Sequence, residues 1–210
     1  MAAASPGNAT VSELPLDSLS DAALVAALCK GSARAASAIW QRYSALVRRT
    51  LCRSLGPDQE LDDLMQDVFI GFVKSAPKLE APGNLKAYLV SIAFRTAAME
   101  IRRRKVRRWV MLTSTGEMVE TPAPTGDPDH ARALRALYKI LDSFSARDRM
   151  VFVARHIEGM QIDETAAALQ LSKATVWRTS KSTLQRVVAR AQEEPTLAAF
   201  VAHSLEGKGQ

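Results

Sequence analysis

The sequence predicts an all-α protein with two small helical domains, joined by a flexible acidic linker that contains proline and glycine. In several segments, apolar residues recur at the i, i+3, i+4 and i+7 spacing of amphipathic helices. Residues 111–130 hold prolines, glycines and four acidic residues but neither lysine nor arginine, a composition typical of linkers. The second half of the chain carries the spacing of a helix-turn-helix over residues 162–176.

Composition narrows the possible functions. The chain has 210 residues and a net charge of +6, and its basic residues lie on both sides of the acidic linker, which fits a polyanion contacted at two places. Cys29 and Cys52 form no metal-binding motif, so we expect no disulfide framework, metal or cofactor. No apolar run is long enough to span a bilayer, and residues 1–10 lack the features of a signal peptide. We therefore expect a cytoplasmic protein without membrane insertion.

The first domain is expected over residues 20–110, after a disordered lead over residues 1–19. Ser20 is placed to cap a helix that stops at Gly31. A longer helix is expected from about Ala33 to Ser54, because Gly56 follows and breaks the pattern. The apolar face of this helix is expected to comprise Ala36, Trp40, Tyr43, Val47 and Leu51.

The clearest helical periodicity in the chain lies between residues 61 and 73. The expected buried face consists of Leu61, Leu64, Met65, Val68, Phe69, Phe72 and Val73. The outward face would then show Asp63, Gln66, Asp67 and Ile70. Charge on an outer helix face is usually just solvated, but an exposed isoleucine among acidic residues also fits a protein-binding surface. Both interpretations remain open at this point.

A further amphipathic helix is expected from Leu85 to Arg108, where it ends in a run of basic residues. The face expected to be buried holds Leu85, Tyr88, Leu89, Ile92, Ala93, Thr96 and Ala97. The opposite face carries Ser91, Phe94, Arg95, Ala98, Arg102 and Lys105. Because positive charge follows phosphates and a flat ring accepts an unpaired base, this face suits a nucleic acid with exposed bases. The alternative is that Phe94 belongs to the core and the arginines form a solvated helix end.

The second domain is expected over residues 131–192 and contains the helix-turn-helix. If Ile162 is position one of that motif, Ala166 falls at position five, where two helices cross closely, and Val176 falls at core position fifteen. Gln170 then occupies the turn position that favours glycine, at a cost of about 1 kcal/mol for a left-handed conformation. An ordinary helical hairpin is the alternative. Two helices are expected before the motif, one marked by Leu134, Leu137, Tyr138 and Leu141 and one that starts near Ala146 and ends at Gly159.

The helix after the turn would begin at Ser172 as N-cap and enter the major groove by its N-terminal part. Its outward residues are Lys173, Thr175, Trp177, Arg178, Lys181 and Ser182. Arginine and lysine can address guanine edges or phosphates, and Trp177 can pack against a sugar or a thymine methyl. The alternative for the lysines is contact with phosphate or water alone. Residues 193–210 form a tail in which a short helix can fold.

Taken in order, these segments resemble the bacterial sigma factors of the sigma-70 family, in their compact extracytoplasmic-function type. Residues 20–110 are similar to the second conserved region of that family, through Trp40-Gln-Arg-Tyr43, Asp62-Asp63-Leu64-Met-Gln66-Asp67-Val68-Phe69 and Ala87-Tyr88-Leu89-Val-Ser-Ile92-Ala93. The fourth region is similar to residues 144–190, through Phe144-Ser-Ala-Arg-Asp-Arg149 and Leu169-Gln-Leu-Ser172. Tyr88 stands where the family usually has tryptophan, and Arg95 where many members have asparagine.

The resemblance implies a subunit that binds core RNA polymerase and promoter DNA and directs transcription initiation. The polymerase-binding residues it implies are Asp62, Asp63, Gln66, Asp67, Val68, Phe69 and Ile70. Those implied for the proximal promoter element are Asn84, Lys86, Tyr88, Phe94, Arg95, Arg102, Arg103 and Lys105. Those implied for the distal element are Ser172, Lys173, Thr175, Trp177, Arg178, Lys181 and Ser182. Factors of this type are often held by an anti-sigma protein, which would be a further partner.

Two other function classes were weighed against this one. A helix-turn-helix regulator would act on duplex DNA without being a polymerase subunit, and its first domain would serve dimerisation or ligand sensing. An enzyme is disfavoured, and we expect no catalytic residues. The sequence shows no nucleophile elbow and no phosphate loop, and its three histidines are scattered at His130, His156 and His203.

Overall fold

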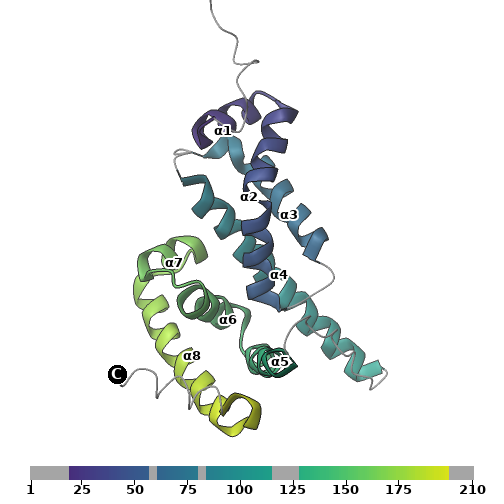
Figure 1. The fold of residues 1–210 in the computed structure, drawn as a ribbon, viewed down its shortest axis with the longest axis vertical. Helices are drawn as coiled ribbons and strands as arrows, with labels where there is room; N and C mark the ends of the chain where they lie inside the picture. The colour runs from purple at the N-terminus through teal and green to yellow at the C-terminus, as the bar shows by residue number, and fades with distance from the viewer. Residues whose placement is uncertain (1–18, 57–60, 80–83, 115–127, 199–210) are drawn as a thin grey trace, which may run out of the picture.

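A computed structural model describes residues 19–56, 61–79, 84–114 and 128–198. The described residues form helices and turns without any strand, which confirms the predicted class. The helices are α1 (Asp21–Cys29), α2 (Ala33–Leu55), α3 (Leu61–Ser75), the 3₁₀ turn η2 (Ala76–Lys78), α4 (Leu85–Ser114), α5 (Pro128–Asp142), α6 (Ala146–Phe152) with its π-helical continuation η4 (Val153–Ile157), α7 (Ile162–Leu169) and α8 (Lys173–Glu193). In Figure 1, α1 to α3 occupy the upper half, α5 to α8 the lower half, and α4 runs between them.

Local signals place the helix ends as the sequence predicted. The hydroxyl of Ser20 accepts a hydrogen bond from the Ala23 N–H, and Gly56 follows the end of α2 with a φ of 89°. Ser172 caps α8, and Gln170 adopts the left-handed conformation at the turn, with a φ of 55°. The helix-turn-helix geometry is therefore confirmed, and the structure accepts the strain of a non-glycine residue at this position.

The linker prediction needs correction at both ends. Helix α4 continues to Ser114, so residues 111–114 are helical, because no helix-breaking residue occurs before Gly116. Helix α5 begins at Pro128, a residue that is favourable at the first position of a helix because its missing N–H would have no partner there. Residues 115–127, residues 1–18 of the predicted lead and the tail beyond residue 198 lie outside the described residues.

The core of the first domain lies between α2, α3 and α4. The Trp40 and Phe69 rings join α2 to α3 at a centroid distance of 4.2 Å, and the Phe72 and Tyr88 rings join α3 to α4 at 6.4 Å. The expected face of α3 is buried except for Val73, which is 44% exposed near the end of the helix. The apolar periodicity therefore predicted the inner side of α3 with one error.

The second domain has two small cores. One lies between α5, α6 and α8, where Leu141, Phe144 and Val187 are buried together, and Leu197 from the short helical turn after α8 joins it. The other fills the helix-turn-helix with Val151, Ala166 and Val176. The C-terminal segment therefore packs on the second domain through Leu197.

The two domains are packed against each other. The buried residues of the first domain form one continuous cluster with Ala146, Met150, Val153, Ala154 and Ala168 of the second. Helices α6 and α7 both pack against α4, and Figure 1 shows them on one side of it. Five consecutive residues, 150–154, are buried, so the segment is covered on all sides, whereas a surface helix would bury only one stripe.

This packing explains the main error in the predicted faces. Phe94 was expected on the outward face of α4, but its exposed fraction is 0%, and Ala98 is also buried. At helical spacing, both lie on the same side of α4 as Lys105, whose ammonium group bonds to the second domain. The sequence analysis expected α4 to bury only one side, whereas α4 packs against α2 and α3 and also against α6 and α7 of the second domain.

Candidate protein- and nucleic-acid-binding surfaces

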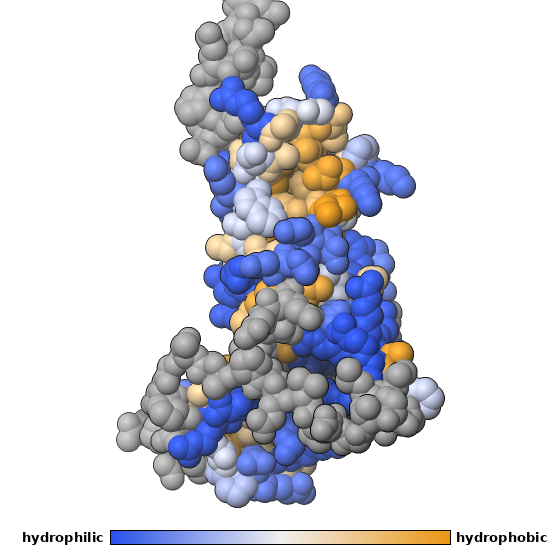
Figure 2. All heavy atoms as spheres, turned by 90° about the vertical axis from the view of Figure 1, so that its right-hand side faces the viewer, coloured by the Kyte–Doolittle hydropathy of each residue, from blue (hydrophilic) through white to orange (hydrophobic). Residues whose placement is uncertain are grey.

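The outer side of α3 is the candidate protein-binding surface, and it combines acidic and apolar residues. Asp63, Gln66 and Asp67 are exposed there, with Ile70 50% exposed among them. Asp62 is also exposed and forms an ion pair with Arg48 of α2. Figure 2 shows apolar surface gathered in the upper half of the molecule, at the level of α1 to α3. A partner with complementary basic and apolar groups fits this side.

Two of the seven residues implied for polymerase binding are not accessible. Val68 and Phe69 are buried in the core of the first domain, because they lie on the inner side of α3. They support the surface from beneath and do not form part of it. Conversely, the predicted set did not include Val73 of α3 or Trp40 of α2, both of which are partly exposed. Trp40 occurs at a position of α2 where the apolar spacing predicts burial, so no sequence signal indicated that its ring would be partly exposed.

The candidate proximal nucleic-acid surface lies on α4. Arg95, Arg102 and Arg103 are exposed, as is Lys86 near the start of the helix. Asn84 caps α4 by accepting a hydrogen bond from the Ala87 N–H at 3.1 Å. Tyr88 is half-buried against Phe72, and Phe94 is fully buried. In this arrangement α4 therefore presents cations without the stacking ring that was expected beside them.

A buried carboxylate organises part of the basic run, which the sequence analysis did not anticipate. Glu100 is 4% exposed and pairs with Arg104 Nε at 3.0 Å and with Arg107 Nη2 at 2.6 Å. The two guanidinium groups compensate the cost of removing this charge from water. The pairs hold Arg104 and Arg107 on one side of α4 and lower the net charge of the run. The i, i+4 spacing of Glu100 and Arg104 was the available sequence signal.

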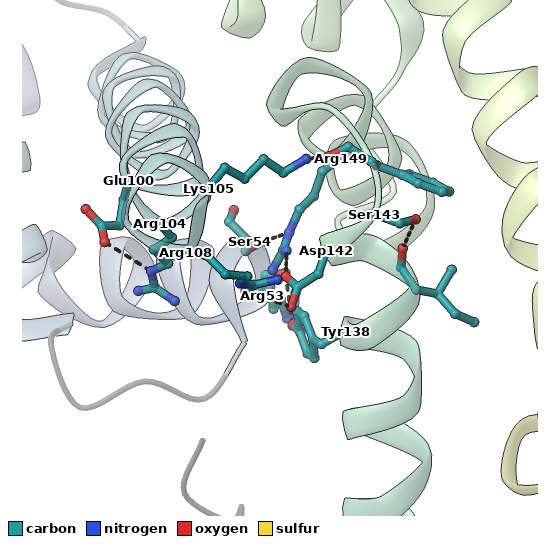
Figure 3. A network of polar contacts seen from close by, with 12 residues as sticks. Arg53, Ser54, Glu100, Arg104, Lys105, Arg108, Tyr138, Asp142, Ser143 and Arg149 are labelled. Carbon is teal, nitrogen blue, oxygen red and sulfur yellow. Dashed lines mark hydrogen bonds and ion pairs between the residues drawn. The ribbon is translucent and has the colours of Figure 1, made fainter. Parts of the chain in front are cut away.

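Lys105 and Arg108 contact the second domain. The Lys105 ammonium group donates to the carbonyl of Phe144, and Arg108 Nη2 lies 3.7 Å from Asp142 Oδ2. Beside them, Arg149 is 2% exposed; its Nη1 contacts Asp142 Oδ1 at 2.5 Å and its Nε donates to the Ser54 carbonyl at 2.8 Å. Figure 3 shows these side chains converging where the end of α2 meets α5 and α6.

Tyr138 completes this contact between the domains. Its hydroxyl donates to the carbonyls of Arg53 and Cys52 at 3.0 and 3.2 Å. Burial raises the pKa of Tyr138 to about 12, so the hydroxyl stays protonated and remains a donor at neutral pH. Arg53 also pairs with Glu158 at 3.0 Å. The C-terminus of α2 thus receives several donors from the second domain.

The candidate distal nucleic-acid surface is the N-terminal half of α8. Trp177 is 57% exposed, with Arg178 exposed beside it and the Lys181 ammonium 5.5 Å from the ring centroid. Lys173 pairs with Asp163 of α7 at 2.8 Å, and a shallow hollow lies between Ile162 and Trp177. The helix therefore presents cations and an apolar ring together, groups that can contact base edges and thymine methyl groups in a groove.

Two of the predicted distal residues have local roles in the helix cap. The Ser172 hydroxyl accepts from the Thr175 N–H at 3.2 Å, and the two hydroxyl oxygens lie 2.8 Å apart. Ser182 is exposed farther along α8. The capping contacts fix the first turn of the helix, directly before Trp177 and Arg178.

The described residues show no grouping suited to a metal ion. No cluster of three histidine, cysteine or acidic side chains with that capacity occurs among them. Within the same residues, no helix is both long enough and apolar enough to cross a membrane.

Comparison with known proteins agrees with the order of these surfaces. A family model described as Sigma-70 region 2 matches residues 39–107, and one described as Sigma-70, region 4 matches residues 134–189. An RNA polymerase sigma-E factor of Streptomyces coelicolor is 34% identical over 167 residues, which cover 79% of this chain and 88% of that protein. The ECF RNA polymerase sigma factor SigX of Bacillus subtilis is 29% identical over 56% of this chain and 63% of its own length.

The fold agrees as well. The co-crystal structure of the sigma factor RpoE with the anti-sigma factor NepR from Bartonella quintana superimposes with a TM-score of 0.54 at 21% identity, over 74% of this chain and 95% of that one. Two region models in the same order, and a relative matched over most of its length, leave one assignment: the chain belongs to the sigma-70 family of RNA polymerase sigma factors, in the extracytoplasmic-function type, and directs transcription initiation.

Proposed function

We propose that the outer side of α3 binds core RNA polymerase, that α4 contacts the opened proximal promoter element and that α8 reads the distal element as duplex. The observation that carries the proposal is the exposed acidic and apolar surface formed by Asp63, Gln66, Asp67 and Ile70. A sigma factor must be recruited before it selects a promoter, and this surface lies apart from the cations of α4 and α8. We expect the chain to act in the cytoplasm and to catalyse no reaction itself.

Binding to core RNA polymerase tests the α3 surface. The triple variant Asp63→Ala, Gln66→Ala, Asp67→Ala is expected to lose binding in a co-elution experiment while keeping its helical circular dichroism. The matched control is Gln185→Ala, Gln192→Ala, Glu193→Ala, which removes three exposed polar side chains from α8 and leaves α3 unchanged. Equal binding by both triple variants would refute the assignment of α3. A folded original chain that does not bind the polymerase would favour a regulator that acts alone.

The two DNA surfaces differ in the DNA they should prefer. Helix α4 presents the exposed side chains of Arg95, Arg102 and Arg103, which are spaced over two turns and suit the phosphates of separated strands. Helix α8 presents Trp177 and Arg178 at the start of a helix-turn-helix reading helix, which suits base edges in a major groove. Footprinting of the chain with core polymerase should show protection at two promoter positions. Arg178→Ala should remove the distal protection first.

An anti-sigma protein is a further proposed partner. The support is limited to the shared fold with the RpoE factor that was crystallised with NepR. A partner of this kind would keep the chain from core polymerase. Added to the co-elution experiment, it should displace the original chain from the polymerase in proportion to its concentration.

A further inference from the structure

We propose that Trp109, near the end of α4, is a stacking platform for an unpaired base of single-stranded DNA, at the end of a stripe of cations and apolar side chains on this helix. The stripe consists of Arg95, Met99, Arg102, Val106 and Trp109. The inference rests on the proposed contact between α4 and the opened promoter. It adds the aromatic ring that this contact lacks, because Phe94 is buried.

Helix geometry brings these five residues to one side of α4. Steps of four, three, four and three residues separate them, which is the spacing of neighbours along one helix face. At a rise of about 1.5 Å per residue, the stretch from Arg95 to Trp109 is about 21 Å long. Successive charges of one DNA strand are about 3.4 Å apart, so the stripe has room for several nucleotides. All five side chains are exposed, and a strand can reach them without any change in the packing of the helices.

The apolar members of the stripe are exposed to an unusual degree. Trp109 is 69% exposed, Val106 62% and Met99 51%. The first two are the most exposed large apolar side chains in the part of the chain that the structure describes. Single apolar residues on a surface are ordinary, but three at helical spacing form a patch, and such patches mark binding sites.

The cations decide which partner fits this patch. Arg102 and the adjacent Arg103 are exposed, and no ion pair to either occurs among the residues that the structure describes. Arg104 and Arg107 differ, because the buried carboxylate of Glu100 pairs with both. The positive charge on the stripe's side is therefore available to a polyanion. Cations that follow the phosphates, together with an aromatic ring on which a base stacks, are the means by which proteins bind single strands.

The length of α4 brings Trp109 into the stripe. The sequence predicted a helix end at Arg108, whereas α4 continues to Ser114. Had the helix ended at Arg108, the Trp109 ring would belong to the linker, and no helix face would be assigned to it. The match to Sigma-70 region 2 ends at residue 107, so Trp109 lies outside it. In Figure 1 the last turns of α4 extend away from the other helices, where a strand can approach.

Binding of oligothymidylate to the full-length chain tests the ring. Trp109→Ala is expected to weaken binding about five- to a hundredfold, the factor for the loss of one stacked base. Stacking releases no counterions, so this variant should keep the slope of log affinity against log salt, whereas Arg102→Ala should reduce the slope by about 0.7. Fluorescence anisotropy of the labelled strand over a series of salt concentrations measures both quantities.

Two further variants control this measurement. Trp109→Phe keeps an aromatic ring at the position and should retain most of the affinity that Trp109→Ala loses. Leu134→Ala, the matched control, shortens another exposed apolar side chain, on α5 and outside every proposed binding surface. It should change neither the affinity nor the slope.

Tryptophan fluorescence reads the stacking directly. The chain has three tryptophans, so Trp40→Phe and Trp177→Phe together leave Trp109 as the sole emitter. Its emission should be quenched as the strand is added, because a stacked base lies against the ring. The quenching should saturate at the same strand concentration as the anisotropy. A strand that binds without quenching this emission would overturn the inference.

The outcomes separate the ring from the proposed role of α4. Unchanged affinity in Trp109→Ala would overturn the inference, and if Arg102→Ala still lowers the slope, the role of α4 stands. Unchanged affinity and slope in both variants would overturn the inference and the role together. If Trp109→Ala weakens binding to core RNA polymerase and leaves strand binding unchanged, the ring belongs to a protein contact, which also overturns the inference.

Discussion

Helices α4 and α8 are both long and basic, yet the structure uses them differently. α8 buries one side, with Val176 and Val187, and leaves Trp177 and Arg178 in solvent. α4 packs against α2 and α3 and also against the second domain, so Phe94 is buried and Lys105 is bonded. The difference teaches that a basic helix is available to nucleic acid only on the sides that no other element covers.

The largest expected effect is the difference in stability loss between removing the Phe94 ring of α4 and removing the Trp177 ring of α8. Phe94→Ala should lower the free energy of unfolding by about 3–5 kcal/mol, because it empties a fully buried ring site. Trp177→Ala should change it by no more than about 0.5 kcal/mol, because that ring is mostly exposed. Urea unfolding followed by circular dichroism measures both. Similar losses in the two variants would remove the contrast between the helices.

The next effect concerns duplex DNA. With core polymerase present, Arg178→Ala should weaken binding to promoter duplex by about 1–3 kcal/mol, because a base-edge or phosphate contact is lost at the start of α8. Gln185→Ala, an exposed residue farther along the same helix, is the control. Fluorescence anisotropy on labelled promoter DNA gives both affinities. Equal affinities would show that the exposed start of α8 does not read DNA.

A smaller effect separates two cations of α4. Arg103→Ala should reduce the slope of log affinity against log salt for a single strand by about 0.7, the value for one phosphate contact. Lys105→Ala should change the slope less in the free chain, since its ammonium already bonds to Phe144. Filter binding over a series of salt concentrations measures the slopes. A larger change for Lys105→Ala would mean that the bond to the Phe144 carbonyl does not occupy this ammonium group.

The smallest effect is a pH dependence in the second domain. Burial lowers the pKa of His156, which lies 3.0 Å from the Ser180 hydroxyl and against the Phe152 ring. Because folding favours the neutral imidazole, its contribution to stability is complete above the ordinary pKa of 6.5 and is lost as pH falls from there through the folded pKa. His156→Gln should flatten the decline in Tm below about pH 6.5. An unchanged pH profile in this variant would assign the decline to other groups.

Much of the helix-turn-helix could be predicted from the sequence, because its determinants are local. Ser172 as cap and Gln170 at the left-handed turn are fixed by neighbours within a few residues, and the motif spacing that pairs Val176 with Ala166 spans only ten residues. The same holds for the outer side of α3, where a regular apolar pattern leaves Asp63, Gln66 and Asp67 on the exposed side. Burial of Val68 and Phe69 follows from that pattern too, and their assignment to the binding surface came from the family motif alone.

By itself, the sequence determined the helices and their caps, since periodicity and capping act over one or two turns. The order of the two regions and the family came from the resemblance of its motifs to a known family. Only the tertiary structure decided that Phe94 is buried in a cluster shared by the two domains, that Lys105 and Arg149 bond across the domains and that Tyr138 caps α2. These contacts join residues far apart in the chain, and no local pattern states which partner an apolar side will meet. Residues 150–154 are all apolar, but that this segment is buried on more than one side became visible only in the folded chain.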